Sequence, residues 1–224
     1  EIQDILVLKN NKGTEDNRVR KLDYSIQLSK LFYERFIQNG TISLFSPHDV
    51  PGLYDAFGGD TFDELYTRYE SDESIPRSTI DAQELILDLL KERAETGRIY
   101  IMNIDHCNTH SSFKDKVYMS NLCQEITLPT DPIQHIDGGG EIALCILSAV
   151  NVGKLRNLDE MEELCDLSVR ALEELIDYQK YPVEAARKST LARRSLGIGY
   201  IGLAHYLAKN GVKYEDPEAW KLVH

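Results

Sequence analysis

The stretch Ser120-Asn121-Leu122-Cys123-Gln124-Glu125-Ile126 places an amide, a thiol and a carboxylate at alternate positions. If this segment is extended, successive side chains point to opposite faces, so Asn121, Cys123 and Glu125 share one face. A helix would spread the same three side chains over roughly 200°. The strand-favouring residues that follow, and the proline after them, favour the extended form. The sequence therefore predicts a hydrogen-bonding amide, a reactive sulfur and a proton-accepting carboxylate on one face.

A second interpretation of this stretch is purely structural. A triplet of this length also arises by chance, and a reduced cysteine is more often a small buried apolar residue than a reactive group. The triplet alone does not distinguish the reactive interpretation from the structural one, so motifs elsewhere in the chain are needed.

Composition excludes several classes of protein. The 224 residues carry 37 acidic and 25 basic side chains, a formal net charge of -12. That charge argues against non-specific binding to DNA, RNA or an anionic membrane surface. It leaves room for a bound nucleotide, which needs only local positive groups or backbone N–H donors. No apolar run approaches the roughly 20 residues of a membrane span.

Cysteine usage and the first residues of the chain indicate the compartment. Four cysteines do not make a disulfide scaffold, so we expect reduced thiols. The N-terminus has no basic and apolar leader pattern, and we expect a cytoplasmic protein. The chain has no initiator Met and stops at His224 just after a helical pattern, so we expect a piece of a longer polypeptide.

Hydrophobic periodicity and turn residues predict alternating helices and strands, and therefore an α/β architecture with a largely parallel sheet. Asp60, Asp81 and Asn157 are candidate N-caps. Expected strands are 42–45, 98–103 and 141–148; expected helices are 22–38, 60–69, 82–97, 157–178, 184–194 and 203–209.

The predicted strand 141–148 is the most apolar in the chain and is apolar on both faces, as in a buried strand of an α/β fold. Cys145 would share a face with Ala143 and Leu147. Taken alone, this pattern predicts a core cysteine.

Two other motifs suggest ligand sites. Asp105-His106-Cys107-Asn108-Thr109-His110 could contribute zinc ligands, but the chain lacks a Cys-x-x-Cys pair. The alternative is a polar loop whose side chains bond to backbone. Gly197, Gly199 and Gly202 match the dinucleotide-binding spacing without the acidic residue that should follow. We expect these glycines to allow close packing between a strand and the helix 203–209.

Taken together, motifs along the whole chain resemble, in one order, the large catalytic subunit of class I ribonucleoside-diphosphate reductases. The matching segments are Leu6-Val7-Leu8-Lys9-Asn10-Asn11, Leu44-Phe45-Ser46-Pro47, Asp49-Val50-Pro51-Gly52-Leu53-Tyr54-Asp55-Ala56-Phe57, Thr96-Gly97-Arg98-Ile99-Tyr100, the 105–110 motif, Ser120-Asn121-Leu122-Cys123, Gly140-Glu141-Ile142-Ala143-Leu144-Cys145 and Arg193-Arg194-Ser195-Leu196-Gly197-Ile198-Gly199. By this resemblance, residues 1–224 are part of a catalytic barrel domain that lacks its upstream and downstream parts.

The resemblance implies a ten-stranded α/β barrel of two five-stranded halves, with a central finger loop whose tip matches residues 120–126. It also implies radical-based reduction of ribonucleoside diphosphates. Cys123 would form the thiyl radical that removes the ribose 3′ hydrogen, and Glu125 would take the 3′-hydroxyl proton. Asn121 would hydrogen-bond the ribose hydroxyls, and Ser120 and Leu122 would complete the substrate contacts.

Cys145 matches one of two thiols that reduce the 2′ position and end as a disulfide. Its partner in the family lies upstream of Glu1. The resemblance therefore implies that the fragment is inactive alone.

No metal or organic cofactor is expected on this chain. The resemblance implies a radical from a metal-containing small subunit, thioredoxin or glutaredoxin as reductant, and a homodimer in the full enzyme. Allosteric ATP and deoxynucleotides would bind mainly outside this segment, and no nucleic acid or membrane partner is expected. Two alternatives remain: a non-catalytic interaction module derived from the enzyme, or a zinc-stabilised domain using His106 and Cys107.

Overall fold

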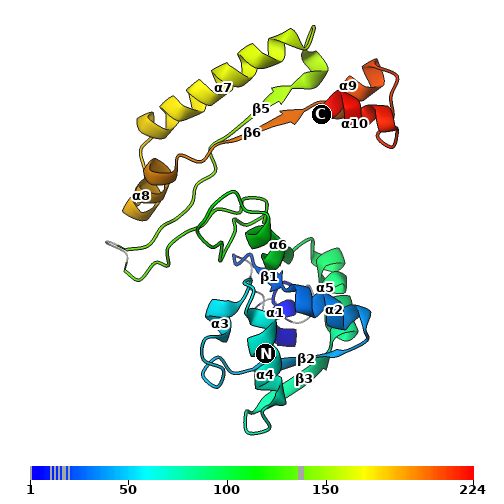
Figure 1. The fold of residues 1–224 in the computed structure, drawn as a ribbon, viewed down its shortest axis with the longest axis vertical. Coiled ribbons are helices and arrows are strands. Elements are labelled where there is room, and N and C mark those ends of the chain that lie inside the picture. The colour runs from blue at the N-terminus through cyan, green and yellow to red at the C-terminus, as the bar shows by residue number, and fades with distance from the viewer. Residues whose placement is uncertain are drawn as a thin grey trace. The chain divides into compact units, whose positions relative to one another are not determined.

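The computed structural model describes residues 2–10, 12, 14, 16, 19, 21–135 and 139–224. The chain divides into two compact units, Glu1–Pro129 and Thr130–His224, and each is described by itself. Helices and strands alternate in both units, so the predicted α/β class is confirmed (Figure 1).

The first unit contains two pairs of strands. β1 (Ser25–Leu28) runs parallel to β4 (Tyr100–Asn103), and β2 (Thr41–Phe45) runs antiparallel to β3 (Arg77–Asp81). Its helices are α1 (Ile2–Leu6), α2 (Lys30–Ile37), α3 (Leu53–Ala56), α4 (Phe62–Ser71), α5 (Ala82–Thr96) and α6 (Ile104–Thr109).

The main core of this unit lies between α1, α2, α5 and the β1–β4 pair. Its fully buried members are Leu6, Leu28, Phe32, Ala82, Leu85, Leu89 and Ile99. Each helix contributes apolar residues one turn apart, which gives a single buried stripe. A smaller cluster of Met102, Ile104 and Val117 lies beside α6.

The second unit is built on one parallel strand pair, β5 (Leu147–Asn151) with β6 (Gly197–Ile201). A short 3-10 turn, η2 (Val152–Lys154), follows β5. The helices are α7 (Asp159–Tyr178), α8 (Glu184–Arg193), α9 (Leu203–Lys209) and α10 (Pro217–Val223).

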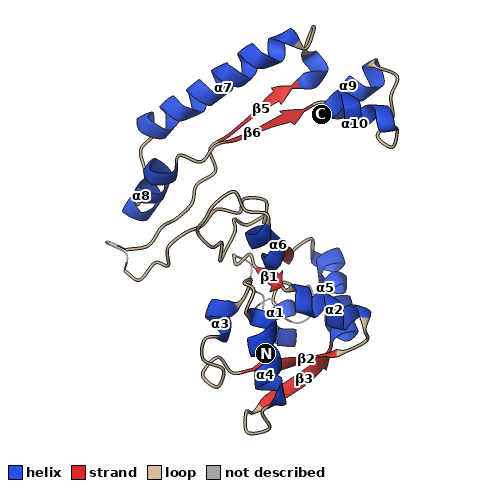
Figure 2. Ribbon diagram, viewed as in Figure 1, coloured by secondary structure: helices blue, strands red, loops and turns tan. Residues whose placement is uncertain are grey.

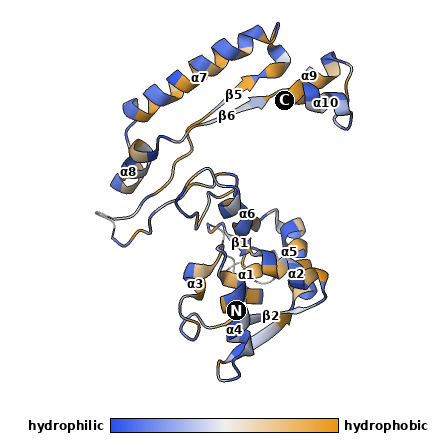
Figure 3. Ribbon diagram, viewed as in Figure 1, coloured by the Kyte–Doolittle hydropathy of each residue, from blue (hydrophilic) through white to orange (hydrophobic). Residues whose placement is uncertain are grey.

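α7 covers one face of the β5–β6 pair (Figure 2). Leu172 and Ile176 pack on Ile146 and Ile198, so the core side of the pair faces this helix. Figure 3 shows apolar and polar residues alternating along α7, as expected of a helix with one buried stripe. Cys165 of the same helix packs against a second cluster, formed by Val150, Val152 and Leu155.

Gly202, at the start of α9, has φ +76°. A Cβ on this residue would lie 2.5 Å from the Asn151 side chain and 3.2 Å from the backbone of Gly153. The predicted close packing is therefore confirmed at Gly202, whereas a Cβ on Gly199 would meet nothing within 4 Å.

The predicted helix at 22–38 is partly wrong, because its first part is strand β1. Ser29 stands in an extended conformation and its Oγ accepts a hydrogen bond from the amide of Phe32 at 3.2 Å. A serine in this position starts a helix, so α2 can begin only at Lys30. Ile26 and Leu28 therefore belong to a strand whose burial increases from Ser25 to Leu28.

The predicted strand 141–148 is also largely wrong, because regular strand begins only at Leu147. The amide of Glu141 donates to Asp131 O and that of Ile142 to Ala185 O, rather than to a neighbouring strand. The apolar residues at 141–148 predict burial, but they do not indicate whether a neighbouring strand is present to pair with them.

The largely parallel sheet is confirmed only in part. The described strands form three two-stranded sheets, of which two are parallel, and they do not close a barrel. Within the described residues, no helix combines the length and the apolarity needed to cross a bilayer.

Helix α5 gives a stability test. The Asp81 carboxylate accepts hydrogen bonds from Gln83 N at 2.8 Å and Glu84 N at 2.9 Å, which confirms the predicted cap. Asp81→Ala should lower the free energy of unfolding by about 1 kcal/mol in a urea titration followed by circular dichroism.

Asp60→Ala is the matched control. Asp60 was predicted to cap α4, but Thr61 holds that position and no side chain caps the helix. We expect its unfolding free energy to change by less than about 0.5 kcal/mol. Equal effects of the two substitutions would contradict this assignment.

Candidate functional site

Residues 120–126, which we call the Cys123 loop, form a tight turn. The amide of Gln124 donates to Asn121 O at 3.1 Å, and Gln124 has φ +65°. The prediction that this stretch is extended is therefore wrong, and so is the argument that period-two spacing alone aligns Asn121, Cys123 and Glu125. Asn side chains readily bond to nearby backbone, which stabilises turns over strands.

The two ends of the Cys123 loop are joined by side chains. Asn121 Oδ1 accepts the amide of Ile126 at 3.0 Å, and Ser120 Oγ donates to Ile126 O at 2.5 Å. Gln124 Nε2 donates to Asn121 O at 2.7 Å. Both backbone groups of Ile126 are thus paired, and the turn containing Cys123 is closed without a strand ladder.

The reactive groups of the loop face outward. Cys123 is an exposed thiol, Glu125 is exposed, and Leu122 between Asn121 and Cys123 is 49% exposed. Within the described part of the chain, the Nδ2 of Asn121 has no hydrogen-bond acceptor, so it can donate to a bound molecule. The loop therefore leaves a thiol, a carboxylate and an amide donor accessible within five residues.

Cys145 belongs to the second unit and is exposed, so the prediction of a core cysteine is wrong. Its neighbour Ile146 is buried against α7, whereas Leu147 is 55% exposed. Side chains alternate along an extended segment. Cys145 therefore lies with Leu147 on the side of the chain away from α7.

The face that continues from Cys145 carries the exposed Leu147 and, beyond it, two small residues. Ala149 is exposed and stands opposite Gly199 of β6. A Cβ on Gly199 would meet nothing within 4 Å. Glycine in a strand often marks the close approach of a ligand or another backbone.

A part-buried ion pair holds the segment that carries Cys145. Glu141 Oε2 accepts from Arg193 Nη2 at 2.9 Å and from the amide of Asp131 at 3.1 Å. Burial acts to raise the pKa of the Glu141 carboxyl, but these hydrogen bonds outweigh it, and the pKa lies below that of an ordinary glutamate. Glu141 is therefore charged at neutral pH and fixes the chain four residues before the thiol.

The 105–110 motif forms helix α6 rather than a loop. The rings of His106 and His110 stack edge to face at 5.7 Å, and Cys107 packs against the small cluster beside α6. Burial raises the pKa of the Cys107 thiol. Asn108 and Thr109 bond to backbone groups, as the polar alternative predicted. In the part of the chain that is described, no three His, Cys, Asp or Glu side chains gather at metal-binding distances.

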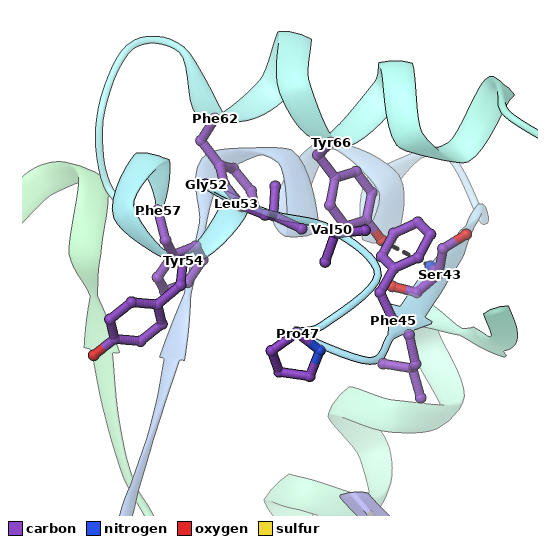
Figure 4. A pocket seen from close by; sticks show the side chains of 11 residues that line it. Ser43, Phe45, Pro47, Val50, Gly52, Leu53, Tyr54, Phe57, Phe62 and Tyr66 are labelled. Carbon is purple, nitrogen blue, oxygen red and sulfur yellow. Dashed lines mark hydrogen bonds between the residues drawn. The ribbon is translucent and has the colours of Figure 1, made fainter. Parts of the chain in front are cut away.

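An apolar pocket of about 360 Å³ lies between β2, the 46–53 loop, α3 and α4, and no sequence pattern predicted it (Figure 4). Tyr66 closes one side, where its hydroxyl donates to Ser43 O and accepts from Ser43 N, both at 2.7 Å. Burial raises the pKa of Tyr66 to about 12. With only tyrosines as titratable lining groups, this pocket offers no acid or base that works near neutral pH.

Comparison with known proteins bears on the Cys123 loop. The whole chain, residues 1–224, matches the family described as ribonucleotide reductase, barrel domain. The chain belongs to this family. This match confirms the resemblance found in the sequence.

Three relatives illustrate the match. The chain is 60% identical to the ribonucleoside-diphosphate reductase subunit alpha of Haemophilus influenzae and 55% identical to the ribonucleoside-diphosphate reductase 1 subunit alpha of Escherichia coli, each over 230 residues and 100% of the chain. It is 44% identical to the subunit alpha of Enterobacteria phage T4 over 96% of the chain. The chain spans about 30% of the length of these relatives.

The ion pair at Glu141 predicts a specific acid dependence. Because the folded pKa of Glu141 is lowered, its contribution to stability is complete above the ordinary glutamate pKa of about 4.3 and is lost as the pH falls through the lowered value. We expect Glu141→Gln to show a smaller fall in unfolding free energy than the wild type between pH 7 and pH 3, measured by urea titration.

Asp131→Asn is the control, since that carboxylate is exposed and lies 4.0 Å from Lys188. Its acid dependence should follow the wild type. A wild-type response in Glu141→Gln would show that the pair with Arg193 does not stabilise the fold.

Proposed function

We propose that this chain is the part of a ribonucleoside-diphosphate reductase large subunit that carries the radical cysteine. The observation that carries the proposal is the closed Cys123 loop, which presents an exposed thiol, an exposed carboxylate and an available amide donor within five residues. Membership of the reductase family supports the assignment of substrate and reaction.

In the proposed reaction, Cys123 as a thiyl radical takes the 3′ hydrogen atom of a ribonucleoside diphosphate. The S–H bond forms, the C3′–H bond breaks, and the unpaired electron moves to C3′. Glu125 takes the 3′-hydroxyl proton while the 2′-hydroxyl leaves as water with a proton from the reducing thiols. Asn121 holds the ribose hydroxyls, with Ser120 and Leu122 beside it.

Cys145 and a second thiol supply the two electrons that reduce C2′ and become a disulfide. Cys123 then returns the hydrogen atom to C3′ and recovers its radical. The products are a deoxyribonucleoside diphosphate, water and one disulfide, so atoms and electrons balance. The exposure of Cys145 on the side away from α7 supports this role.

We also propose the finer fold, a ten-stranded α/β barrel with the Cys123 loop as its central finger. In such a barrel, helices lie outside and alternate strand residues face the interior. The β5–β6 pair supports this arrangement, because α7 packs on one face and leaves Leu147 and Ala149 exposed on the other. Cys145 would then face the interior.

The remaining partners follow from the same proposal. A metal-containing small subunit supplies the radical, thioredoxin or glutaredoxin reduces the Cys145 disulfide, and the large subunit is a homodimer in the cytoplasm. Allosteric ATP and deoxynucleotides bind mainly outside residues 1–224. No metal or organic cofactor is assigned to these residues.

Substitution of the radical cysteine tests the proposal. In the full-length large subunit containing this segment, assayed for CDP reduction with its small subunit and a dithiol, Cys123→Ser should lower turnover at least about 10³-fold, because removing a reacting group abolishes its step. Cys165 is a thiol of α7 that packs against Val150 of β5 and Val152 of η2, and Cys165→Ala should stay within a few-fold of the wild type.

The outcomes separate the candidate functions. Turnover by Cys123→Ser would remove Cys123 from the radical role. Inactivity of a well-folded wild type would favour a non-catalytic interaction module.

The isolated 224-residue chain should not turn over CDP even with the small subunit and a dithiol. Cys145 needs a second reducing thiol, and none of the other cysteines matches that role in the family motifs. The measurement is product formation by the chain alone and by the chain combined with its flanking segments. Reduction by the chain alone would contradict the proposal.

A further inference from the structure

The backbone just before the Cys123 loop is held by one asparagine. Asn108 of α6 accepts the amide of Val117 through Oδ1 at 2.8 Å and donates through Nδ2 to Val117 O at 3.1 Å. One side-chain amide thus pairs with both backbone groups of a single residue, as a neighbouring strand would. Val117 is fully buried, so these two groups have no access to water.

This pairing matters because the surrounding segment has no regular structure. Residues 111–135 contain neither helix nor strand. Buried backbone groups without partners are costly, so such a segment depends on side chains to fix its path. Asn108 supplies both hydrogen-bond partners for the backbone of Val117, which lies three residues before Ser120.

A second contact holds the same stretch from the other side. Gln27 Nε2, on β1, donates to Tyr118 O at 2.7 Å. Beyond Cys123, the Ser120 hydroxyl donates to Ile126 O, and Asn121 Oδ1 accepts from Ile126 N. Together with the bonds to Val117 and Tyr118, these contacts fix the chain on both sides of Cys123.

Helix α6 is itself firmly placed, so it can act as a reference for the loop. Ile104 is buried against Met102 and Val117, and Asn108 Nδ2 also donates to Ile104 O at 3.2 Å. The carboxylate of Asp105 accepts the amide of Lys30 at 2.5 Å, which ties α6 to the start of α2. Gly58 (φ +73°) lies so close that a Cβ there would be 2.4 Å from Ile104 Cγ1.

We propose that Asn108 is a positioning residue for Cys123, and that the 105–110 motif serves to hold the radical loop rather than a metal. The inference rests on the proposed function of Cys123. Active groups must be held close to their productive geometry by supporting contacts, and a displacement of about 1 Å can cost about 10²-fold in rate. Among the described residues, the hydrogen bonds of the Asn108 side chain go to Ile104 and Val117 and not to Cys123, so its proposed effect passes through the backbone of residues 117–120.

Hydrogen exchange measures the anchoring without any turnover. Exchange is followed by mass spectrometry on the full 224-residue chain as wild type, Asn108→Leu, Asn108→Asp and Thr109→Val. Asp keeps the acceptor for Val117 N and loses the donor to Val117 O. Thr109, the next residue of α6, is exposed, and its hydroxyl bonds to Asp105 O and to His110 and to nothing else among the described residues, which makes it the matched control.

We expect exchange in residues 117–126 to rise at least about tenfold in Asn108→Leu, by less in Asn108→Asp, and not in Thr109→Val, since local opening follows lost contacts. Exchange in α5 should not change. Equal exchange in 117–126 for Asn108→Leu and Thr109→Val would overturn the proposal. So would uniform loss of protection across the first unit in both Asn108 variants, because Asn108 would then support the unit as a whole.

Turnover in the full-length subunit tests whether the anchor positions the thiol. Asn108→Leu should lower kcat for CDP by about 10- to 100-fold with KM within about threefold, and Asn108→Asp should recover part of kcat. Unchanged kcat in Asn108→Leu, or a rise in KM alone, would overturn the positioning role.

The two failures are distinguishable. If Cys123→Ser keeps its turnover, the proposed function fails and the positioning role fails with it, while the exchange data still decide whether Asn108 anchors the loop. If Cys123→Ser is inactive and Asn108→Leu keeps the wild-type kcat, only the positioning role fails.

Discussion

The need to pair buried backbone groups outside any strand ladder governs the region around Cys123. Two asparagines meet it: Asn108 pairs with Val117 before the loop, and Asn121 pairs with Ile126 after it. Each replaces a hydrogen-bonding neighbour that a strand would have provided. The exposed Cys123 thiol therefore lies on a backbone that is hydrogen-bonded before and after it, and the turn that carries the thiol is accessible to a ligand.

Local signals predicted several elements of the fold correctly. Asp81 caps α5, β2 includes the predicted 42–45, and the glycine motif gives the close approach between Gly202 and Gly153. These features depend on a few neighbouring residues. The errors at 22–38 and 141–148 have another cause, because apolar periodicity reports burial without naming the partner. Ser29 ended one predicted helix, and tertiary bonds at Glu141 replaced a strand ladder.

The residue types of the candidate site are read directly from the sequence, and the roles of Asn121, Cys123 and Glu125 stay a prediction, whereas the predicted geometry was wrong. The residue types at 121, 123 and 125 pointed to an amide, a thiol and a carboxylate, and the family match fits that interpretation. The backbone path was wrong, because the side chains of Ser120 and Asn121 bond across the turn and so oppose an extended segment. The contact between Asn108 and Val117 was not predicted, because a single side-chain contact of this kind produces no periodic pattern in the sequence.

Gly58 lies far from Cys123 in the sequence, yet its lack of a side chain affects how the Cys123 loop is held. Its missing side chain is what lets α6 lie where Asn108 can reach Val117, since any Cβ would collide with Ile104. In a screen of all single substitutions, this glycine would behave as an active-site position although it carries no reactive group. Under the proposed function, the geometry of one sulfur therefore depends on the absence of a methyl group in the link between α3 and α4.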